Sequence, residues 1–458
     1  MDAQAASAAS RRGAPGGPIR TDLTTLVKLA GPVIFSRLGI MTMGLTDAIV
    51  VGRYSPVQLG YHALAWAPTS VAVTVSIGLL TGIQVMTARA IGEGRRAAAG
   101  AVLRRGLTYA AIVGLAASLL LAAIGQLLLH SLGLPRDLAD GATTPLIVFS
   151  LSLTPYTIST AGVIWLEALS RPTPAMLMMW LANAVNLAID MVLVPGHFGA
   201  PALGAVGGAC ATLGARTALM IAILAYIACM GEARALGVFD KPPRDRAAEA
   251  EQRRIGFGAG ASNFFEVAAF AAMNIIAGWV GELTVASWTI VLNVASMIFM
   301  VPLGLSTATA VMVGGAHGAR DGRGVNRAGA IGFAITLAFG ILVALVVGPA
   351  RAQIVAVYTT SAPVIAMATP ALALSCLFFI PDCLQVVAAQ ALRARGDVWV
   401  PSFTHLISYA VVMAPLAWFL ALPLHMGLIG EVWSVVIASL LSAGFLLTRF
   451  AVLARRGI

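Results

Sequence analysis

Long apolar runs, separated by short polar segments, make up most of this sequence. A run of about 20 apolar residues is long enough to cross the roughly 30 Å hydrocarbon layer of a bilayer as a helix. Backbone groups in lipid must be paired within the protein, which leaves helices or closed barrels. The runs here are much longer than the roughly ten-residue alternating strands of a barrel. The pattern therefore predicts helices.

Twelve such runs define an all-α, polytopic membrane protein with 12 transmembrane helices. Six runs precede the longest polar segment and six follow it. Because six is even, both halves enter the membrane in the same orientation, and we expect two six-helix bundles related by a pseudo-two-fold axis along the membrane normal. The predicted spans are residues 25–51, 63–90, 106–129, 144–168, 173–195, 203–230, 256–280, 286–313, 328–348, 363–392, 399–422 and 427–450.

Composition supports a lipid environment. Of the 458 residues, 59% are hydrophobic and only 10% are charged. A single water-soluble core could not bury that much apolar surface. We expect a multi-pass protein of the cell inner membrane that acts as a monomer in the bilayer and carries no bound cofactor.

The net charge of +10 raises the question of a nucleic-acid partner, and the charge distribution answers it. If the amino terminus lies inside, 21 Lys and Arg residues fall on the inner side and three, Arg53, Arg136 and Arg351, fall on the outer side. Such an excess is typical of cytoplasmic loops. The excess of positive charge is therefore explained by the membrane topology, which places both termini in the cytoplasm. No nucleic-acid partner is expected.

The longest polar segment, residues 231–255, contains Pro242 and Pro243 and is predicted to be a cytoplasmic linker. It would separate an N-lobe at residues 25–230 from a C-lobe at residues 256–458, after a disordered cytoplasmic tail at residues 1–24. The lobes also repeat weakly at one offset of 226 residues, which indicates duplication. Val85, Met86, Ala90 and Gly92 recur as Val311, Met312, Ala316 and Gly318, and Pro155, Leu166 and Ala168 recur as Pro381, Leu392 and Ala394.

Four acidic residues lie well inside predicted spans, where an ionised group costs several kcal/mol unless it lines a polar cavity. Asp47 and Asp190 lie at similar depths in the first half, roughly 6 to 8 Å below the outer ends of their spans. Glu266 and Asp382 lie at similar depths in the second half, roughly 15 Å above the inner ends. Each lobe therefore holds one pair of candidate coupling carboxylates.

Polar side chains at helical spacing accompany these acids. They supply oxygen ligands and hydrogen-bond partners, although polar contacts between helices without a role in transport are the alternative. His405 is placed one turn before Tyr409, and a packed histidine is its alternative. The candidates for lining a polar cavity or contacting substrate are Asn183, Asn186, Asn263, Phe378, Gln385, Asn293 and His405.

Two kinds of coupling ion fit these acids. A carboxyl group removed from water is stable as the neutral acid, so it can carry a proton. Two such groups with amide oxygens nearby can instead hold Na⁺, with Glu266 and Asp382 as the possible ligands. Arg37 and Arg216 also lie near mid-depth in the first half, where they could neutralise Asp47 and Asp190. The choice of ion and the role of the two arginines stay open at this stage.

Four segments carry a resemblance to a known family. They are TDAIVVGRYSPVQLGYHALA, LEALSRPTPAMLMMWLANAVNLAIDMVLVPGHFGAPALGAVGGACAT, NFFEVAAFAAMNIIAGWVGELTVASWTIVLN and FFIPDCLQVVAAQALRARGD. They resemble the multidrug and toxic compound extrusion (MATE) family, most closely its NorM-type branch, over nearly the whole chain after residue 25.

The resemblance implies antiport of cationic or polyaromatic organic compounds against Na⁺ or H⁺ by two six-helix bundles. It also implies that Asp47 matches the first-helix aspartate of the family, and that Glu266 and Asp382 match the carboxylates that hold the coupling cation in NorM-type members. Asn186 matches an asparagine on the fifth helix. Asp190 stands where NorM-type members usually have asparagine, and Phe378 where many have tyrosine.

Other classes fit less well. An ATP-driven pump needs a glycine-rich phosphate loop that ends in lysine, and the only lysines, Lys28 and Lys241, lie in no such context. An intramembrane aspartyl protease needs two acids in one site, whereas these pairs are assigned to separate lobes, so no enzyme activity is expected. A lipid or lipid-linked intermediate flippase shares this architecture and is the main alternative to multidrug efflux.

Overall fold

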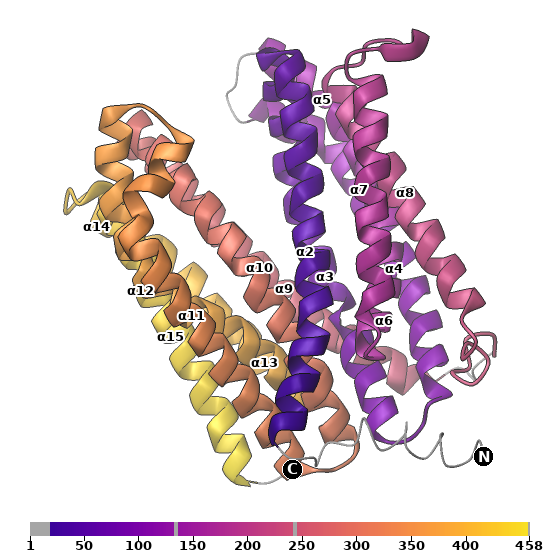
Figure 1. Cartoon of the computed structure of the whole chain (residues 1–458). Coiled ribbons are helices and arrows are strands. Elements are labelled where there is room, and N and C mark those ends of the chain that lie inside the picture. The colour runs from indigo at the N-terminus through magenta and orange to yellow at the C-terminus, as the bar shows by residue number, and fades with distance from the viewer. Residues whose placement is uncertain (1–18, 132–135, 241–244, 457–458) are drawn as a thin grey trace. The chain divides into compact units, whose positions relative to one another are not determined.

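The computed structural model describes residues 19–131, 136–240 and 245–456. These residues form helices joined by short turns, and no strand occurs among them. The helices are α2(Ile19–Tyr54), α3(Pro56–Gly92), α4(Ala98–Ser131), α5(Arg136–Leu151), α6(Leu153–Ala168), α7(Pro172–Leu193), α8(Ala205–Cys229), α9(Arg246–Val280), α10(Glu282–Gly318), α11(Gly322–Tyr358), α12(Ala362–Arg395), α13(Trp399–His405), α14(Ala414–Ala421) and α15(Gly427–Arg456). A 3₁₀ turn, η1(His197–Gly199), and a π-helical segment, η2(Leu406–Met413), complete the set (Figure 1).

Within the described residues, 12 helical segments are long and apolar enough to cross a membrane. Ten are single helices. The fourth consists of α5 and α6, and the eleventh consists of α13, η2 and α14. The predicted all-α class with 12 membrane-spanning helices is therefore confirmed.

Helix ends differ from the predicted span ends because helices continue beyond the apolar run. The largest differences are ten residues: α11 ends at Tyr358, beyond the predicted span at 328–348, and α9 begins at Arg246, before the predicted span at 256–280. Asp245 accepts a hydrogen bond from the backbone N–H of Ala248 at 3.0 Å and so caps the first turn. The last part of the predicted linker is therefore helical.

Contacts divide the chain into two compact units. The carboxyl-terminal unit contains the described residues up to Ile34, residues Ile91–Gly94 and the chain from Ala261 onward. The amino-terminal unit contains Phe35–Ala90 and Arg95–Gly260. Helices α2 and α9 thus contribute to both. The lobe boundaries at residues 25–230 and 256–458 stay a prediction, and the tail predicted at residues 1–24 lies largely outside the described residues.

In the amino-terminal unit, glycines let α3 and α9 pack backbone to backbone. A Cβ atom added to Gly78 would lie 2.6 Å from the Cα atom of Gly260, and one added to Gly256 would collide with the carbonyl oxygen of Leu79. Only residues without a side chain permit so close an approach. This packing holds the first half of α9 in the amino-terminal unit.

In the carboxyl-terminal unit, one large buried cluster gathers side chains from α9, α10, α11, α12, η2, α14 and α15. Trp288 and Tyr409 are its largest fully buried members. The beginning of α2 belongs to a second cluster of this unit, in which Leu26 packs with Leu305 of α10.

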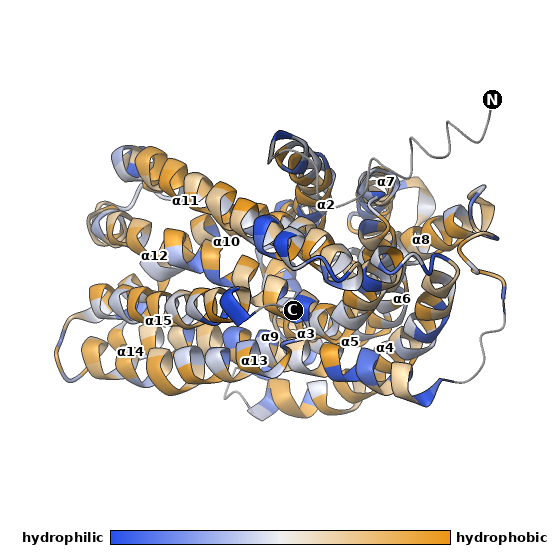
Figure 2. Ribbon diagram, turned by 90° about the horizontal axis from the view of Figure 1, so that it is seen from below, coloured by the Kyte–Doolittle hydropathy of each residue, from blue (hydrophilic) through white to orange (hydrophobic). Residues whose placement is uncertain are grey.

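Large apolar side chains are exposed along the helices, as lipid contact requires. Leu127 of α4 and Leu345 of α11 are 70% and 68% exposed, respectively. Figure 2 shows apolar residues over most of the helix lengths and hydrophilic residues mainly near helix ends. A soluble protein rarely exposes apolar surface on this scale, so the chain is a multi-pass membrane protein.

Candidate functional site

Two buried aspartates lie together in the amino-terminal unit. Asp47 on α2 and Asp190 on α7 are 1% and 0% exposed, and their carboxyl groups interact electrostatically. Asn186 donates from Nδ2 to Oδ1 of Asp47 at 2.9 Å, and the hydroxyl of Thr212 on α8 donates to Oδ2. Neither oxygen of Asp190 has a hydrogen-bond partner among the described residues. The structure thus brings together three of the predicted site residues and adds Thr212.

The two interior arginines, Arg37 and Arg216, form no ion pair with either aspartate among the described residues, although Asp47 interacts electrostatically with Arg216. Nη2 of Arg37 lies 3.1 Å from Oε2 of Glu167, whose side chain is 1% exposed. Nη1 of Arg216 donates to the hydroxyl of Ser152 at 2.8 Å. Its guanidinium group also stacks on Tyr156, 4.6 Å from the ring centroid. Arg37 therefore balances a different carboxylate, while Arg216 is stabilised by a hydroxyl and a ring.

The second carboxylate pair lies in the carboxyl-terminal unit. Glu266 on α9 and Asp382 on α12 are both partly exposed, and the two interact electrostatically. The hydroxyl of Tyr409 donates to Oδ1 of Asp382 at 3.3 Å, and Nε2 of Gln385 lies 3.5 Å from the same oxygen. Arg393 also interacts with Glu266. Two acids with hydroxyl and amide partners can bind a proton or a small cation such as Na⁺.

A π-helical segment positions Tyr409. The segment η2 interrupts the eleventh span between α13 and α14 and contains this tyrosine. Single π-helical turns are rare and occur often at functional sites, because the extra residue rotates the following side chains. His405, one turn earlier, packs edge-on against the ring of Tyr409 with 5.5 Å between ring centroids. At 2% exposure it is packed in this structure, and a role in lining a cavity stays a prediction.

The remaining candidates differ in burial and in the contacts they make. Asn183 is buried and donates to the carbonyl oxygen of Met179 at 2.9 Å. Phe378 is buried against Phe379. Asn293 is exposed and donates to the carbonyl oxygen of Thr289, its own preceding turn. Asn263 is partly exposed. A role in contacting substrate stays a prediction for all four.

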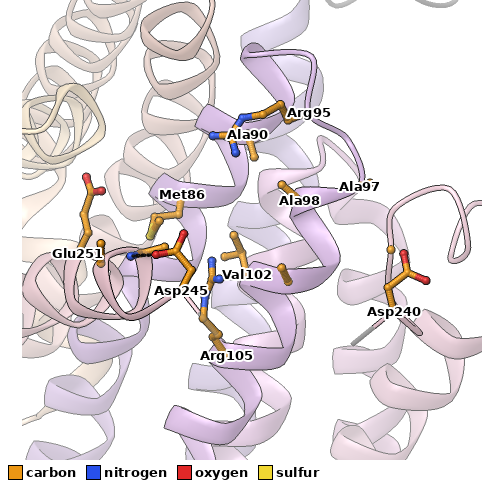
Figure 3. Close-up of a pocket in the computed structure, with 14 residues that line it drawn as sticks. Met86, Ala90, Arg95, Ala97, Ala98, Val102, Arg105, Asp240, Asp245 and Glu251 are labelled. Atoms are coloured by element: carbon orange, nitrogen blue, oxygen red, sulfur yellow. Dashed lines mark hydrogen bonds between the residues drawn. The ribbon is translucent and has the colours of Figure 1, made fainter. Parts of the chain in front are cut away.

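A cavity of about 640 Å³ lies in another part of the amino-terminal unit (Figure 3). The end of α3, the start of α4, the segment after Gly237 and the start of α9 enclose it. Small side chains such as Ala98 line it together with Arg95 and Arg105. No carboxylate of either pair lines this cavity.

Comparison with known proteins gives the family. The model of the MatE family matches residues 32–192 and 259–419, which together exceed half of the chain. This chain belongs to the MatE family. The resemblance predicted from the residues is confirmed. The family model matches twice, at an offset one residue longer than the internal repeat, which supports duplication of the two halves of this MatE protein.

Similar proteins extend over nearly the whole MatE chain. A probable multidrug resistance protein NorM of Caulobacter vibrioides is 61% identical over 96% of this chain and 93% of its own length. The multidrug resistance protein PmpM of Pseudomonas aeruginosa is 28% identical over 88% of this chain and 85% of its own. The crystal structure of the eukaryotic MATE transporter AtDTX14 superposes with a TM-score of 0.87 at 19% identity, covering 96% and 98% of the two chains. This last similarity shows the fold.

Three charged residues of this MatE protein were missed as interior groups. Glu167 and Arg393 lie near the ends of apolar runs, where a charge looks like a solvated boundary residue, yet they are 2% and 3% exposed. Glu431 lies near the start of the last run and is 0% exposed. Helix α12 continues to Arg395, beyond the predicted span end at residue 392, and so places Arg393 inside the helix. Glu167 and Glu431 lie within the predicted spans, and only packing between helices shows that they are buried.

Proposed function

We propose that this protein is a secondary active multidrug efflux antiporter, which exports cationic or polyaromatic organic compounds in exchange for Na⁺ or H⁺. The observation that carries the proposal is the pair Glu266 and Asp382, held in a helical membrane unit with the Tyr409 hydroxyl on Asp382. Ionisable groups cost free energy inside a membrane domain, so their presence in pairs supports a role in ion binding. The similarity to NorM and PmpM supports multidrug export over lipid flipping.

The proposed cycle is alternating access. Binding of the ion at Glu266 and Asp382 neutralises their charge and stabilises one state, and release of the ion on the other side restores the state that binds substrate. Asp47 and Asp190 form a second pair, which we assign to proton binding. The protein is proposed to lie in the inner membrane as a monomer, with both termini in the cytoplasm.

Reconstituted protein tests this function. Proteoliposomes loaded with a fluorescent cationic dye would be given a Na⁺ gradient, an H⁺ gradient or none, and initial rates of dye movement would be compared for Glu266→Gln, Asp382→Asn and Asp47→Asn. Glu282→Gln is the matched control, because Glu282 is an exposed acid at the start of α10. We expect gradient-driven transport in the wild type and in the control. We expect it to be lost in the variants of at least one of the two carboxylate pairs. Unchanged gradient-driven rates in all three variants would refute the assignment.

A further inference from the structure

Glu431 is a buried acid with no role in either carboxylate pair. It lies in the second turn of α15, at the end opposite Arg456, and is 0% exposed. Neither Oε1 nor Oε2 has a hydrogen-bond partner among the described residues. Glu167, which is 2% exposed, has an arginine partner. Glu431 therefore occupies a position where an ionised carboxylate would be unpaired.

Contacts on either side of Glu431 show which helix it faces. A Cβ atom on Gly427 would lie 3.7 Å from Cγ1 of Val280, and the Ser434 hydroxyl lies 3.9 Å from the sulfur of Met273. Glu431 follows Gly427 by four residues and precedes Ser434 by three, so all three share one face of α15. This face contacts α9 at these two positions. In the antiparallel register that these contacts set, Glu431 lies level with Ile276 of α9.

The same register leads from Glu431 to the coupling pair. It places Ser439 and Ser442 of α15 opposite the turn of α9 that carries Glu266, about 15 Å along the helix from Glu431. Ser439 interacts with Asp382. The side chains of Ser434, Ser439 and Ser442 are all 0% exposed. Glu431, Ser434 and Ser442 therefore share the face of α15 that contacts α9, and Ser439 lies beside this face, toward Asp382 of α12. This seam has an acid at one end, hydroxyl groups along it, and the Glu266 and Asp382 pair at the other end.

The charge environment of Glu431 is neutral. Among the described residues, no charged or titratable side chain interacts electrostatically with Glu431. Burial of an unpaired carboxylate costs several kcal/mol, so this group is stable here as the neutral acid. A buried acid without a fixed counter-charge can change protonation whenever water reaches it, which is the property of proton relays in membrane transporters.

We propose that Glu431 passes protons between the Glu266 and Asp382 pair and the end of α15 opposite the carboxyl terminus, along the α9 and α15 seam. The inference rests on the proposed coupling role of that pair. In each transfer Glu431 accepts a proton from water at one side and gives its proton to water at the serine side. Only O–H bonds form and break, and the carboxyl group ends the cycle unchanged. Successive serine hydroxyls are roughly 5 to 8 Å apart along the helix, so water must join them.

Isosteric variants separate a proton relay from a structural role. Glu431→Gln keeps the shape and polarity of the neutral acid but cannot exchange its proton, whereas Glu431→Asp retains exchange. In proteoliposomes under an H⁺ gradient, we expect Glu431→Gln to slow dye transport by about tenfold or more. Dye affinity and Tm should equal those of the wild type, and Glu431→Asp should recover most of the rate.

A second variant leaves the acid in place. Ser442→Val fills the seam with apolar surface, and we expect it to slow H⁺-driven transport without changing dye affinity. If Glu431→Gln does not fold, the H⁺-driven transport rate of Ser442→Val tests the proton path instead.

Several outcomes overturn the proposal. A wild-type H⁺-driven rate in Glu431→Gln, while Asp382→Asn is inactive, refutes the relay and leaves the antiporter function intact. If Glu431→Gln loses dye affinity and Tm together with its transport rate, the residue has a structural role. If a Na⁺ gradient alone drives transport, no proton path is needed. If Glu266→Gln and Asp382→Asn both transport normally, the coupling assignment itself fails, and the relay fails with it.

Discussion

Tyr409 donates a hydrogen bond from its hydroxyl group to Oδ1 of Asp382, with 3.3 Å between the two oxygens. The tyrosine lies in the π-helical segment of the eleventh span and the aspartate lies in α12, so the bond joins two helical segments at the acid. A neutral donor stabilises the ionised carboxylate, so this contact should tune how readily Asp382 gives up an ion if the acid couples transport as proposed.

Removal of this hydroxyl should therefore weaken coupling. A hydrogen bond to a charged group contributes about 1.5 to 3 kcal/mol, so Tyr409→Phe should change the apparent ion affinity by about tenfold. Ion-dependent dye transport in proteoliposomes measures this change, with Tyr358→Phe at the exposed end of α11 as the control. An ion dependence identical to that of the wild type in Tyr409→Phe would mean that the hydroxyl does not act on the coupling carboxylate.

The buried ion pair of Arg37 and Glu167 should be needed for stability. Removal of one partner leaves an uncompensated charge, so Arg37→Gln should destabilise the protein by about 3 kcal/mol or more. The double variant Arg37→Gln with Glu167→Gln should recover much of the loss. Thermal unfolding in detergent measures both effects.

An exposed pair is the control for this experiment. Arg96 and Glu232 lie 3.4 Å apart with side chains 65% and 43% exposed, and exposed pairs contribute at most about 1 kcal/mol. Arg96→Gln should therefore lower Tm only slightly. A similar shift for Arg96→Gln and Arg37→Gln would contradict the buried pairing.

Glycines on one helix should differ in their tolerance of a methyl group. Gly256→Ala places Cβ against the carbonyl oxygen of Leu79, so it should lower Tm. Gly278, also on α9, has open space at this position, and Gly278→Ala should be neutral or stabilising because alanine favours a helix by about 1 kcal/mol. Equal Tm values for the two variants would show that α3 and α9 are not packed this closely.

Thr212 should matter through Asp47. Thr212→Val keeps the side-chain shape and removes the donor to Oδ2 of Asp47, leaving one oxygen of a buried acid unpaired. If the Asp47 and Asp190 pair binds protons, this change should alter the H⁺ dependence of transport. Thr217→Val is the control, because the Thr217 hydroxyl bonds only to the carbonyl oxygen of Leu213 among the contacts described. Unaltered H⁺ dependence in Thr212→Val would exclude a role for this hydroxyl.

The sequence predicts the membrane-spanning helices well because the signal is strong and local. Runs of apolar residues mark all 12 spans, and helical spacing places Asn186 with Asp190. The start of α9 at Arg246 escapes this signal, because a helix that continues into water is charged and resembles a loop. The π-helical turn around Tyr409 has no apolar pattern of its own either.

Side-chain contacts between helices depend on how the helices pack, and the residue pattern of a single helix does not show this. Depth alone pairs Glu266 with Asp382, but the Tyr409 bond requires the rotation of η2 against α12. Likewise, the sequence shows that Arg37 and Arg216 lie inside spans. It does not show that Glu167 is the partner of Arg37, because that pairing depends on how α2 packs against α6. Glu431 was missed because only the packing of α15 on α9 shows its burial.

The most direct test of ion exchange at Glu266 and Asp382 reverses the driving force. Proteoliposomes with equal ion concentrations on both sides would receive a gradient of dye alone, while reporters for Na⁺ and H⁺ follow ion movement. We predict that dye flow drives one of these ions in the opposite direction, and that the double variant Glu266→Gln with Asp382→Asn abolishes this ion movement. Dye flow without any ion movement in the wild type, or undiminished ion movement in the double variant, would contradict the account.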